Sequence, residues 1–159
     1  MIACYTLYDP ASGAAWGKGR CGGQLLAAQR AAALDDGLDL LPVAVDPLRT
    51  WIDAELAAAL REQPNADWEA CVRTKSPSPA TLVSAVDGAL AVDLYAAPEV
   101  VINSIPPWSA LRIVGPVSTE QSYGAGADTE HVRLHAPGRY RFTLVSSRHL
   151  TREWVIDAA

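Results

Sequence analysis

Residues 17–22 carry the spacing of a phosphate-binding loop. They read Gly-Lys-Gly-Arg-Cys-Gly, which matches the GxGxxG pattern, and a helix-like stretch follows them. In a dinucleotide fold this pattern follows a buried apolar strand within a βαβ unit, and the glycines let the backbone approach the pyrophosphate. Here the preceding residues form one arm of a predicted hairpin, and the alternation of strands and helices is missing. We interpret these glycines as a hairpin end that turns into a helix, and we expect no nucleotide cofactor.

Two histidines, His131 and His135, are four residues apart. Imidazole nitrogens bind zinc, but a zinc site needs a third protein ligand, for which Glu130 and Asp128 are the nearby candidates. The region is predicted to be β, where this spacing places both histidines on one face but some distance apart. We therefore expect exposed or strand-face histidines and no bound metal.

Serine and histidine also occur together in residues 146–149, which read Ser-Ser-Arg-His. Nucleophilic catalysis needs a triad in space, which sequence adjacency does not supply, and the chain lacks a Gly-x-Ser-x-Gly elbow. The carboxylate pairs Asp35-Asp36 and Asp53/Glu55 fall at a predicted helix end and a helix start, where solvation or capping explains them. Nothing singles out a glycosidase-like acid pair. The sequence therefore predicts no catalytic residues.

Five tryptophans are unusual in a chain with one phenylalanine and one methionine. Most are expected in the core, but Trp108 follows Pro106-Pro107 and is the tryptophan that we expect to be exposed. Exposed aromatic side chains suit protein interfaces or stacking on sugars, and we favour an interface. The candidate interface residues are Trp16, Trp108 and Tyr123.

The composition is that of a globular chain with a core. Of 159 residues, 50% are apolar and 19% are charged, and the net charge is −5. Nucleic-acid binding needs a basic stripe, whereas the basic residues here are scattered, so no nucleic-acid partner is expected. The first residues lack the basic region of a signal peptide, and no apolar run is long enough to span a membrane, so we expect folding in a cytoplasm. The cysteines, Cys4, Cys21 and Cys71, lack a CxxC spacing and are expected to be small buried side chains.

The first half of the chain mixes strand and helix patterns. Residues 2–8 alternate as a strand, residues 9–13 form a dense turn signal, and residues 14–16 begin a return strand, which together predict a hairpin over 2–20. Further expected elements are a helix over 24–34, a strand over 40–45, a helix from Asp46-Pro47 with an apolar stripe of Leu48, Ile52, Leu56 and Leu60, and a short strand over 68–72.

Residues 75–79, Lys-Ser-Pro-Ser-Pro, predict an extended linker. They separate an N-terminal hairpin and helix docking module, residues 1–75, from a C-terminal domain, residues 80–159. In the second part, Asp87-Gly88 between two β-prone runs predicts a hairpin. Short strands bounded by proline or glycine then predict an antiparallel β-sandwich, with strands over 100–102, 111–114, 131–134, 139–144 and 153–156. The expected fold class is α+β, mostly β.

Both ends of the chain resemble small tail proteins of tailed bacteriophages. Those proteins begin with a strand, a tight hairpin, a return strand with glycine and cysteine, and a short helix, and they close with a small Ig-like β domain. The matching residues are Tyr8 to Gly13, Gly17 to Gly22, Leu25-Leu26 and Gln29 at the start, and Ala136 to Phe142 and Glu153 to Ile156 at the end. The middle, from Asp46 to Tyr95, departs from the pattern because it has more predicted helix.

This resemblance implies a virion structural protein at the tail, baseplate or fibre attachment, made in the cytoplasm of the host bacterium. It implies assembly with other virion proteins and with copies of the chain around a symmetry axis, and no catalytic residues. Two alternatives stay open. One is a carbohydrate-binding or adhesion module that contacts a host-surface glycan through Trp108 and Tyr123. The other is a small metal- or nucleotide-dependent enzyme that uses His131 and His135 or the glycine-rich turn.

Overall fold

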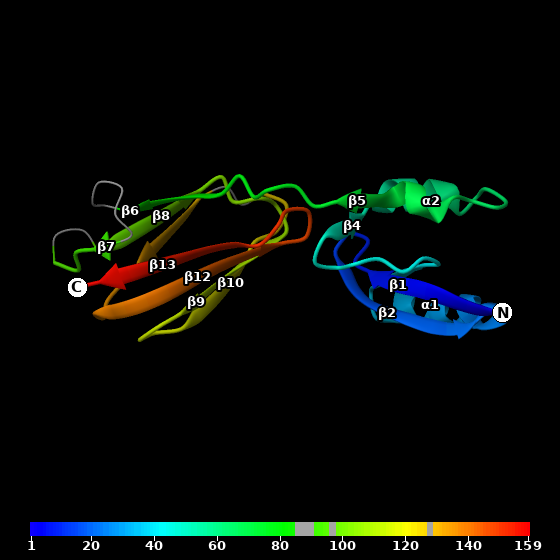
Figure 1. The fold of residues 1–159 in the computed structure, drawn as a ribbon, viewed down its shortest axis with the longest axis horizontal. Helices are drawn as coiled ribbons and strands as arrows, with labels where there is room; N and C mark the ends of the chain where they lie inside the picture. The colour runs from blue at the N-terminus through cyan, green and yellow to red at the C-terminus, as the bar shows by residue number, and fades with distance from the viewer. Residues whose placement is uncertain (85–90, 96–97, 127–128) are drawn as a thin grey trace. The chain divides into compact units, whose positions relative to one another are not determined.

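The computed structural model of the chain describes residues 1–84, 91–95, 98–126 and 129–159. Contacts divide the chain into two compact units, Met1–Ser76 (unit 1) and Pro77–Ala159 (unit 2), each described here by itself (Figure 1). The division falls within the segment predicted as a linker. The fold is mostly β with two α-helices, which confirms the coarse fold class. The hairpin predicted at Asp87-Gly88 lies outside the described residues.

Unit 1 begins with a three-stranded sheet in the order β2-β1-β3. Its strands are β1 (Ile2–Tyr8), β2 (Ala15–Gly22) and β3 (Asp39–Leu41), and both pairings are antiparallel. The turn between β1 and β2 is held by the Asp9 side chain, which accepts hydrogen bonds from Ala11 N at 2.9 Å and Ser12 Oγ at 2.7 Å. Gly13 ends this turn with a φ of 77°.

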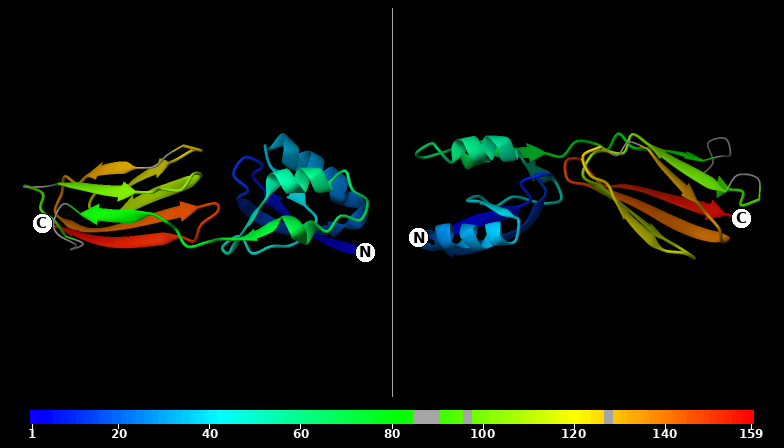
Figure 2. Two further views of the ribbon diagram at one scale, coloured as in Figure 1. Left: turned by 90° about the horizontal axis from the view of Figure 1, so that it is seen from above. Right: turned by 180° about the vertical axis from the view of Figure 1, so that it is seen from behind.

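Helices and a second, two-stranded sheet complete unit 1 (Figure 2). A 3₁₀ turn, η1, leads into α1, and the pair agrees with the predicted helix over 24–34. The strand predicted over 40–45 is limited to β3, and the strand predicted over 68–72 is largely the 3₁₀ turn η2. The elements are η1 (Gly23–Leu25), α1 (Leu26–Asp35), β4 (Thr50–Ile52), α2 (Ala54–Leu60), η2 (Trp68–Cys71) and β5 (Val72–Thr74), and β4 pairs with β5.

The prediction that a helix starts at Asp46 is wrong, because the helix starts later in the chain. Asp46 begins a turn, in which Thr50 N donates to Asp46 O at 2.9 Å. The chain then forms β4, and the helix begins only at Ala54, after Asp53 caps it by accepting from Leu56 N at 3.1 Å. Leu48 is 79% exposed and does not belong to an apolar helix face. Pairing with β5 outweighs the helical spacing of the leucines, because local propensity is a weak constraint beside tertiary contacts.

Unit 2 consists of two sheets that pack face to face (Figure 1). The five-stranded sheet has the order β10-β9-β12-β13-β7, and the three-stranded sheet has the order β11-β8-β6. All pairings are antiparallel except the parallel one between β13 and β7. The strands are β6 (Thr81–Ser84), β7 (Ala91–Val92), β8 (Glu99–Asn103), β9 (Ser109–Val114), β10 (Thr119–Ser122), β11 (Glu130–Arg133), β12 (Gly138–Ser146) and β13 (Arg152–Ala158).

The core of unit 2 follows the alternation seen in the sequence. Tyr140, Phe142 and Leu144 of β12 are buried, as predicted, and they pack with Val100 and Ile102 of β8 from the facing sheet. Strand β10 was not predicted, because its four side chains are all exposed and therefore lack an alternating pattern.

Gly13 and Gly37 offer a matched test of the turn in unit 1. Their φ values are 77° and 75°, but a Cβ at Gly13 would lie 2.2 Å from Ile52 O, whereas a Cβ at Gly37 would meet open space. Gly37→Ala is expected to cost about 1–2 kcal/mol from the left-handed backbone alone. Gly13→Ala is expected to lower the free energy of unfolding, measured by urea denaturation, by at least twice as much. Equal losses for the two variants would contradict the close approach of the turn to β4.

Candidate functional site

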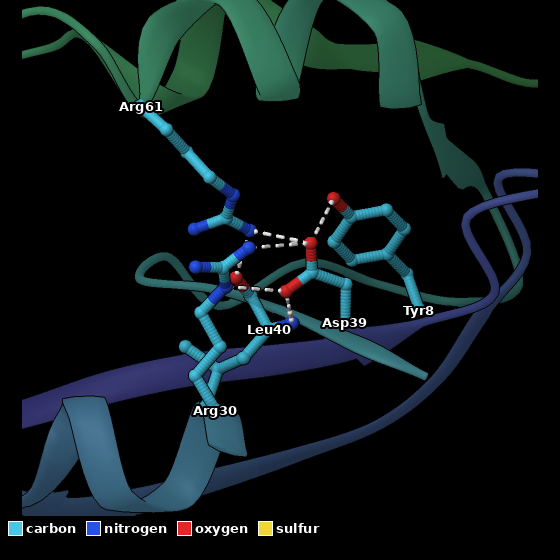
Figure 3. Close-up of polar contacts among 5 residues, drawn as sticks. All are labelled: Tyr8, Arg30, Asp39, Leu40 and Arg61. Atoms are coloured by element: carbon cyan, nitrogen blue, oxygen red, sulfur yellow. Dashed lines mark hydrogen bonds and ion pairs between the residues drawn. The ribbon is translucent and has the colours of Figure 1, made fainter. Parts of the chain in front are cut away.

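A buried carboxylate, Asp39, lies at the centre of a polar cluster in unit 1 (Figure 3). Arg30 Nε donates to Asp39 Oδ1 at 2.7 Å, and Arg61 Nη2 lies 3.0 Å from Asp39 Oδ2. Tyr8 Oη donates to Asp39 Oδ2 at 3.3 Å, and the backbone nitrogen of Leu40 donates to Asp39 Oδ1 at 2.7 Å. The cluster therefore joins β1, α1, β3 and the end of α2 through one side chain.

Asp39 is held in its ionised form. Burial on its own raises the pKa of the carboxyl group, but the hydrogen bonds from Arg30 and Leu40 and the charge of Arg61 outweigh it, so the pKa is lowered. A general acid or base needs a pKa near the working pH. A carboxylate that is ionised at neutral pH and whose oxygens both accept hydrogen bonds does not meet that need, so we assign this cluster to structure rather than to chemistry.

Sequence reasoning missed this cluster. Its partners are far apart in the chain: Tyr8 is 31 positions and Arg61 is 22 positions from Asp39. The available signal was the position of Asp39 itself, because a charged residue directly before a buried apolar strand needs a partner.

An exposed mixed surface, named here the β2 face, lies on the edge of the three-stranded sheet. Trp16, Lys18 and Arg20 alternate along β2, point to one side and are exposed, with Trp16 at 71%. Ile2 of β1 is 75% exposed, and Cys4 of β1, also exposed, pairs with Arg20. A hollow of about 310 Å³ lies here, lined by Cys4, Lys18, Gly19, Arg20 and Ala44.

Unit 2 carries a groove along β10 and β11, the edge strands of its two sheets. One hollow of about 210 Å³ and an adjoining one of about 70 Å³ share several residues. Apolar side chains and polar side chains both contribute. The shared residues are Ile113, Thr119, Val132 and Arg133, and the larger hollow adds Leu111, Gln121, Tyr123, Glu130 and His131.

Tyr123 is the unusual member of this groove. It is 9% exposed, and its hydroxyl is buried beside Glu130. Burial raises the pKa of Tyr123, and the negative charge of Glu130 and a hydrogen bond between the two side chains raise it further, so the phenol stays protonated.

The structure does not bring the predicted metal ligands together. His131 lies on β11 and its Nδ1 is 3.2 Å from Glu99 Oε1, while His135 lines the smaller hollow of the groove. Asp128 lies outside the described residues, which contain no group of three or more His, Cys, Asp or Glu side chains suited to a metal ion.

The side chains of Ser146 and His149 lie within hydrogen-bonding distance of each other. Ser146 Oγ lies 3.4 Å from His149 Nδ1. Burial lowers the pKa of His149, and the charge of Arg148 lowers it further, so the imidazole is neutral at pH 7. Ser146 is only 2% exposed, which places its hydroxyl out of reach of a substrate.

The remaining candidates lie where capping and turns explain them. Residues 17–22 belong to β2, at an exposed sheet edge rather than between a buried strand and a helix. Asp35 ends α1 and Asp36 follows it, whereas Asp53 caps α2 and Glu55 occupies its first turn.

Two predictions about exposure are wrong, one for Trp108 and one for two of the cysteines. Trp108 is half-buried, because its backbone bonds to Gly124 and Ser147 hold it inward; Trp16 is the exposed tryptophan. Cys71 is buried, as expected, but Cys4 is exposed and Cys21 is half-buried, because both lie on strands of an open sheet. All three are free thiols.

Replacing Asp39 tests the structural assignment. Asp39→Asn leaves the charges of Arg30 and Arg61 without their counter-ion. Because a buried charge then has no partner, the free energy of unfolding is expected to fall by about 3 kcal/mol. Tryptophan fluorescence during urea unfolding measures this. The control is Asp157→Asn, which removes the exposed Arg139–Asp157 pair and should change stability little. Equal effects of the two variants would contradict a central role for Asp39.

The same carboxylate predicts an acid transition in unit 1. A carboxyl whose folded pKa is lowered stabilises the fold above its unfolded pKa of about 3.9, and this stabilisation is lost as the pH falls through the folded pKa. The wild-type chain should therefore lose stability below about pH 4. Asp39→Asn should show a smaller loss over the same range, so that the gap between the two melting temperatures narrows as the pH falls below about 4. A constant gap would contradict the lowered pKa.

In the part of the chain that is described, no helix is long and apolar enough to cross a membrane. Among the described residues, the β2 face and the groove of unit 2 are two hollowed surfaces that a partner could contact. Comparisons with protein-family models, with curated proteins and with solved structures found no significant match for this chain.

Proposed function

We propose that the protein is a structural component of a tailed-bacteriophage virion, at the tail, baseplate or fibre attachment, that docks through unit 1 and presents unit 2. It acts by assembly with other virion proteins and with its own copies, without catalysis. The proposal rests on the resemblance of both chain ends to phage tail proteins. The structural observation that carries it is the β2 face.

The β2 face has the composition of a binding hot spot. Tryptophan and arginine are the residue types that contribute most to protein interfaces, and both are exposed here beside Lys18 and Ile2. Because the chain carries a net charge of −5 while this face carries Lys18 and Arg20, its expected partner is an acidic protein surface.

The finer fold proposed for unit 2 is an Ig-like sandwich. Its support is the strand order of the two sheets, with a short edge strand, β7, parallel to the last strand, β13. In Ig domains a tyrosine near the start of strand F donates its hydroxyl to the backbone a few residues upstream. Tyr140 near the start of β12 does so, to Ala136 O at 2.9 Å. The position two residues later, a cysteine in antibody domains, is the buried Phe142 here.

In the proposed function, β1 and β2 form an N-terminal docking hairpin. The two strands pair antiparallel from Ile2 with Gly22 to Tyr8 with Ala15 across the Asp9 turn. In this arrangement one face of the hairpin contributes Tyr8 to the core, while its outer part forms the β2 face.

Virion incorporation tests the proposal. Particles purified from infected host cells should contain the chain by mass spectrometry, and cryo-electron microscopy should place it in the tail. Trp16→Ala should lower incorporation by more than about tenfold, as expected for a hot-spot residue. Far-UV circular dichroism should stay unchanged because Trp16 is exposed.

Tyr95→Ala is the matched control, since Tyr95 is an aromatic side chain that is 98% exposed in unit 2. This variant should be incorporated normally. Absence of the wild-type chain from purified virions would overturn the proposed function, and normal incorporation of Trp16→Ala would overturn the role of the β2 face.

A further inference from the structure

We propose that the open edge of β11 in unit 2 binds an extended polypeptide segment as an added β-strand, with apolar side chains facing inward and acidic side chains facing outward. This inference goes beyond the proposed function, because it concerns a partner of unit 2 and holds whether or not the chain belongs to a virion. It rests on the unequal sizes of the two sheets, on the hollows beside β11 and on the charge of this strand.

The two sheets of unit 2 differ in size. Five strands, in the order β10-β9-β12-β13-β7, face three, in the order β11-β8-β6, and both β10 and β11 lie at the end of their sheet. Thr119 and Gln121 of β10 pair with Ile113 and Leu111 of β9, so the four side chains share the inner face. The two from β9 are buried, whereas the two from β10 are exposed. A fourth strand beside β11 would cover what the smaller sheet leaves uncovered.

The hollows beside β11 follow its main chain. Side chains alternate along a strand, so a hollow over one face of a strand is lined by every second residue. Here all residues from 130 to 133 line the larger hollow, and all residues from 132 to 135 line the smaller one. From β10, only Thr119 and Gln121 of the inner face take part. The groove therefore runs along the open backbone edge of β11 and over the inner face of β10.

The open edge of β11 presents main-chain groups to this groove. On its other side β11 pairs with β8, and Leu134 N donates to Pro98 O at 2.8 Å where that pairing continues. In an antiparallel pair every second residue directs its N–H and C=O to the partner strand. Val132 therefore directs them to β8, whereas His131 and Arg133 direct theirs to the open edge, with which no described strand pairs. A peptide backbone is the ligand that matches such a row of donors and acceptors.

The spacing of the hollows fits the side chains of one strand. The larger hollow, of about 210 Å³, begins at Glu130, and the smaller one, of about 70 Å³, begins two residues later at Val132. Side chains on one face of a strand are also two residues apart. Buried apolar side chains contribute to both hollows, Leu111 and Ile113 to the larger one and Ile113 and Tyr140 to the smaller one. The added strand is therefore expected to direct successive apolar side chains of its inner face into them.

The charges at the edge select the chemistry of the partner. Glu130 lies on the inner face of β11 and is hydrogen-bonded to Tyr123, whereas His131 and Arg133 are exposed on the outer face. Glu99 Oε1 of β8 lies 3.2 Å from His131 Nδ1, but no described carboxylate lies within ion-pairing distance of Arg133. Opposite charges on neighbouring strands stabilise their pairing. The outward positions of the added strand are therefore expected to carry acidic side chains.

A second copy of the chain is the competing occupant of this edge. Pairing β11 with the β11 of another copy would bring two Arg133 side chains into the same short ladder, and like charges on neighbouring strands are destabilising. A short strand with a charged side chain is also a feature by which sheet edges avoid pairing with their own kind, and β11 has four residues. The edge therefore favours a partner of opposite charge over a further copy of itself.

Amide hydrogen exchange of the full-length chain with capped heptapeptides tests the inference. The probes are Ac-Ser-Xaa-Glu-Val-Glu-Xaa-Ser-NH₂ with valine, leucine or phenylalanine at Xaa, so that apolar and polar side chains alternate in either direction of the peptide. At least one peptide should slow the exchange of the His131 and Arg133 amides saturably, by more than about tenfold, because hydrogen bonding protects an amide. The Val132 amide, which already points to β8, and the amides of unit 1 should change little.

Modified peptides separate strand pairing from contact between side chains. The peptide is N-methylated either at its three apolar residues or at the residues between them, which keeps every side chain. The form whose methyl groups point to β11 should lose binding, and the other form should bind as the parent does. Lysine in place of both glutamates should raise the dissociation constant about fivefold, and Arg133→Glu should reverse this preference.

Variants of β10 test the place of binding. Gln121→Phe puts a bulky side chain into the groove and should raise the dissociation constant at least about tenfold, because it occupies the space of the added strand. Ser122→Phe, at the next residue of the same strand but outside the lining, is the matched control and should bind as the wild type does. Both positions are exposed and both variants keep the net charge, so far-UV circular dichroism should stay unchanged.

Three results would overturn the inference: no peptide protects the His131 and Arg133 amides at about 1 mM, both N-methylated forms bind as the parent does, or Gln121→Phe and Ser122→Phe bind equally well. Protection of the same amides that grows with protein concentration in the absence of peptide would assign the edge to a second copy instead. None of these results depends on virion incorporation, so failure here leaves the proposed function untouched.

Discussion

The buried carboxylate of Asp39 is the constraint on which unit 1 depends. A domain of this size buries a smaller share of its surface than a larger domain does, so its apolar core alone leaves little margin of stability. β3 has three residues, all buried, and its first residue is charged. That strand can be buried only because Arg30 and Arg61 supply its counter-charges from two different helices. Removing either arginine would leave β3 with a charge that its position does not tolerate, so the sheet and both helices are coupled through one side chain.

Arg61 shows how closely this network is integrated with packing. Its Nη2 also donates to Leu40 O at 2.6 Å, and its guanidinium lies 5.4 Å from the ring centroid of Trp68. The backbone N–H of Arg61 therefore closes the end of α2, while its side chain fixes the backbone of β3 and covers a tryptophan of η2. Planar, delocalised charge suits arginine to this combination, and lysine would supply the charge without the stacking or the second hydrogen bond.

The features that depend on interactions between neighbouring residues could be predicted from local sequence patterns. Alternation predicted β12 with Tyr140, Phe142 and Leu144 inward, and the Asp9-to-Gly13 signal predicted the turn after β1. Long-range forces escaped prediction: the partners of Asp39 lie in other elements, and pairing with β5 turned the first part of an expected helix into β4. The two walls of the groove belong to different sheets. Gln121 and Glu130 therefore line the same hollow because of the sheet topology, which no short sequence window contains. Tyr123 illustrates the limit, because a backbone hydrogen bond to Ser109 fixes it beside β9, and Ser109 lies outside any short sequence window around Tyr123.

The proposed docking through the β2 face raises the question of how an edge strand could bind a partner without aggregating. β2 has eight residues and one open edge, which is the geometry that recruits a further strand. Lys18 and Arg20 oppose that pairing between like copies, because two such strands would bring their charges together. The same charges attract an acidic surface, and Trp16 beside them supplies the apolar contact area that gives such an encounter a slow dissociation rate. Contact through the side-chain face, rather than through the strand edge, would therefore allow the proposed docking surface to expose a tryptophan without recruiting a second copy of the strand.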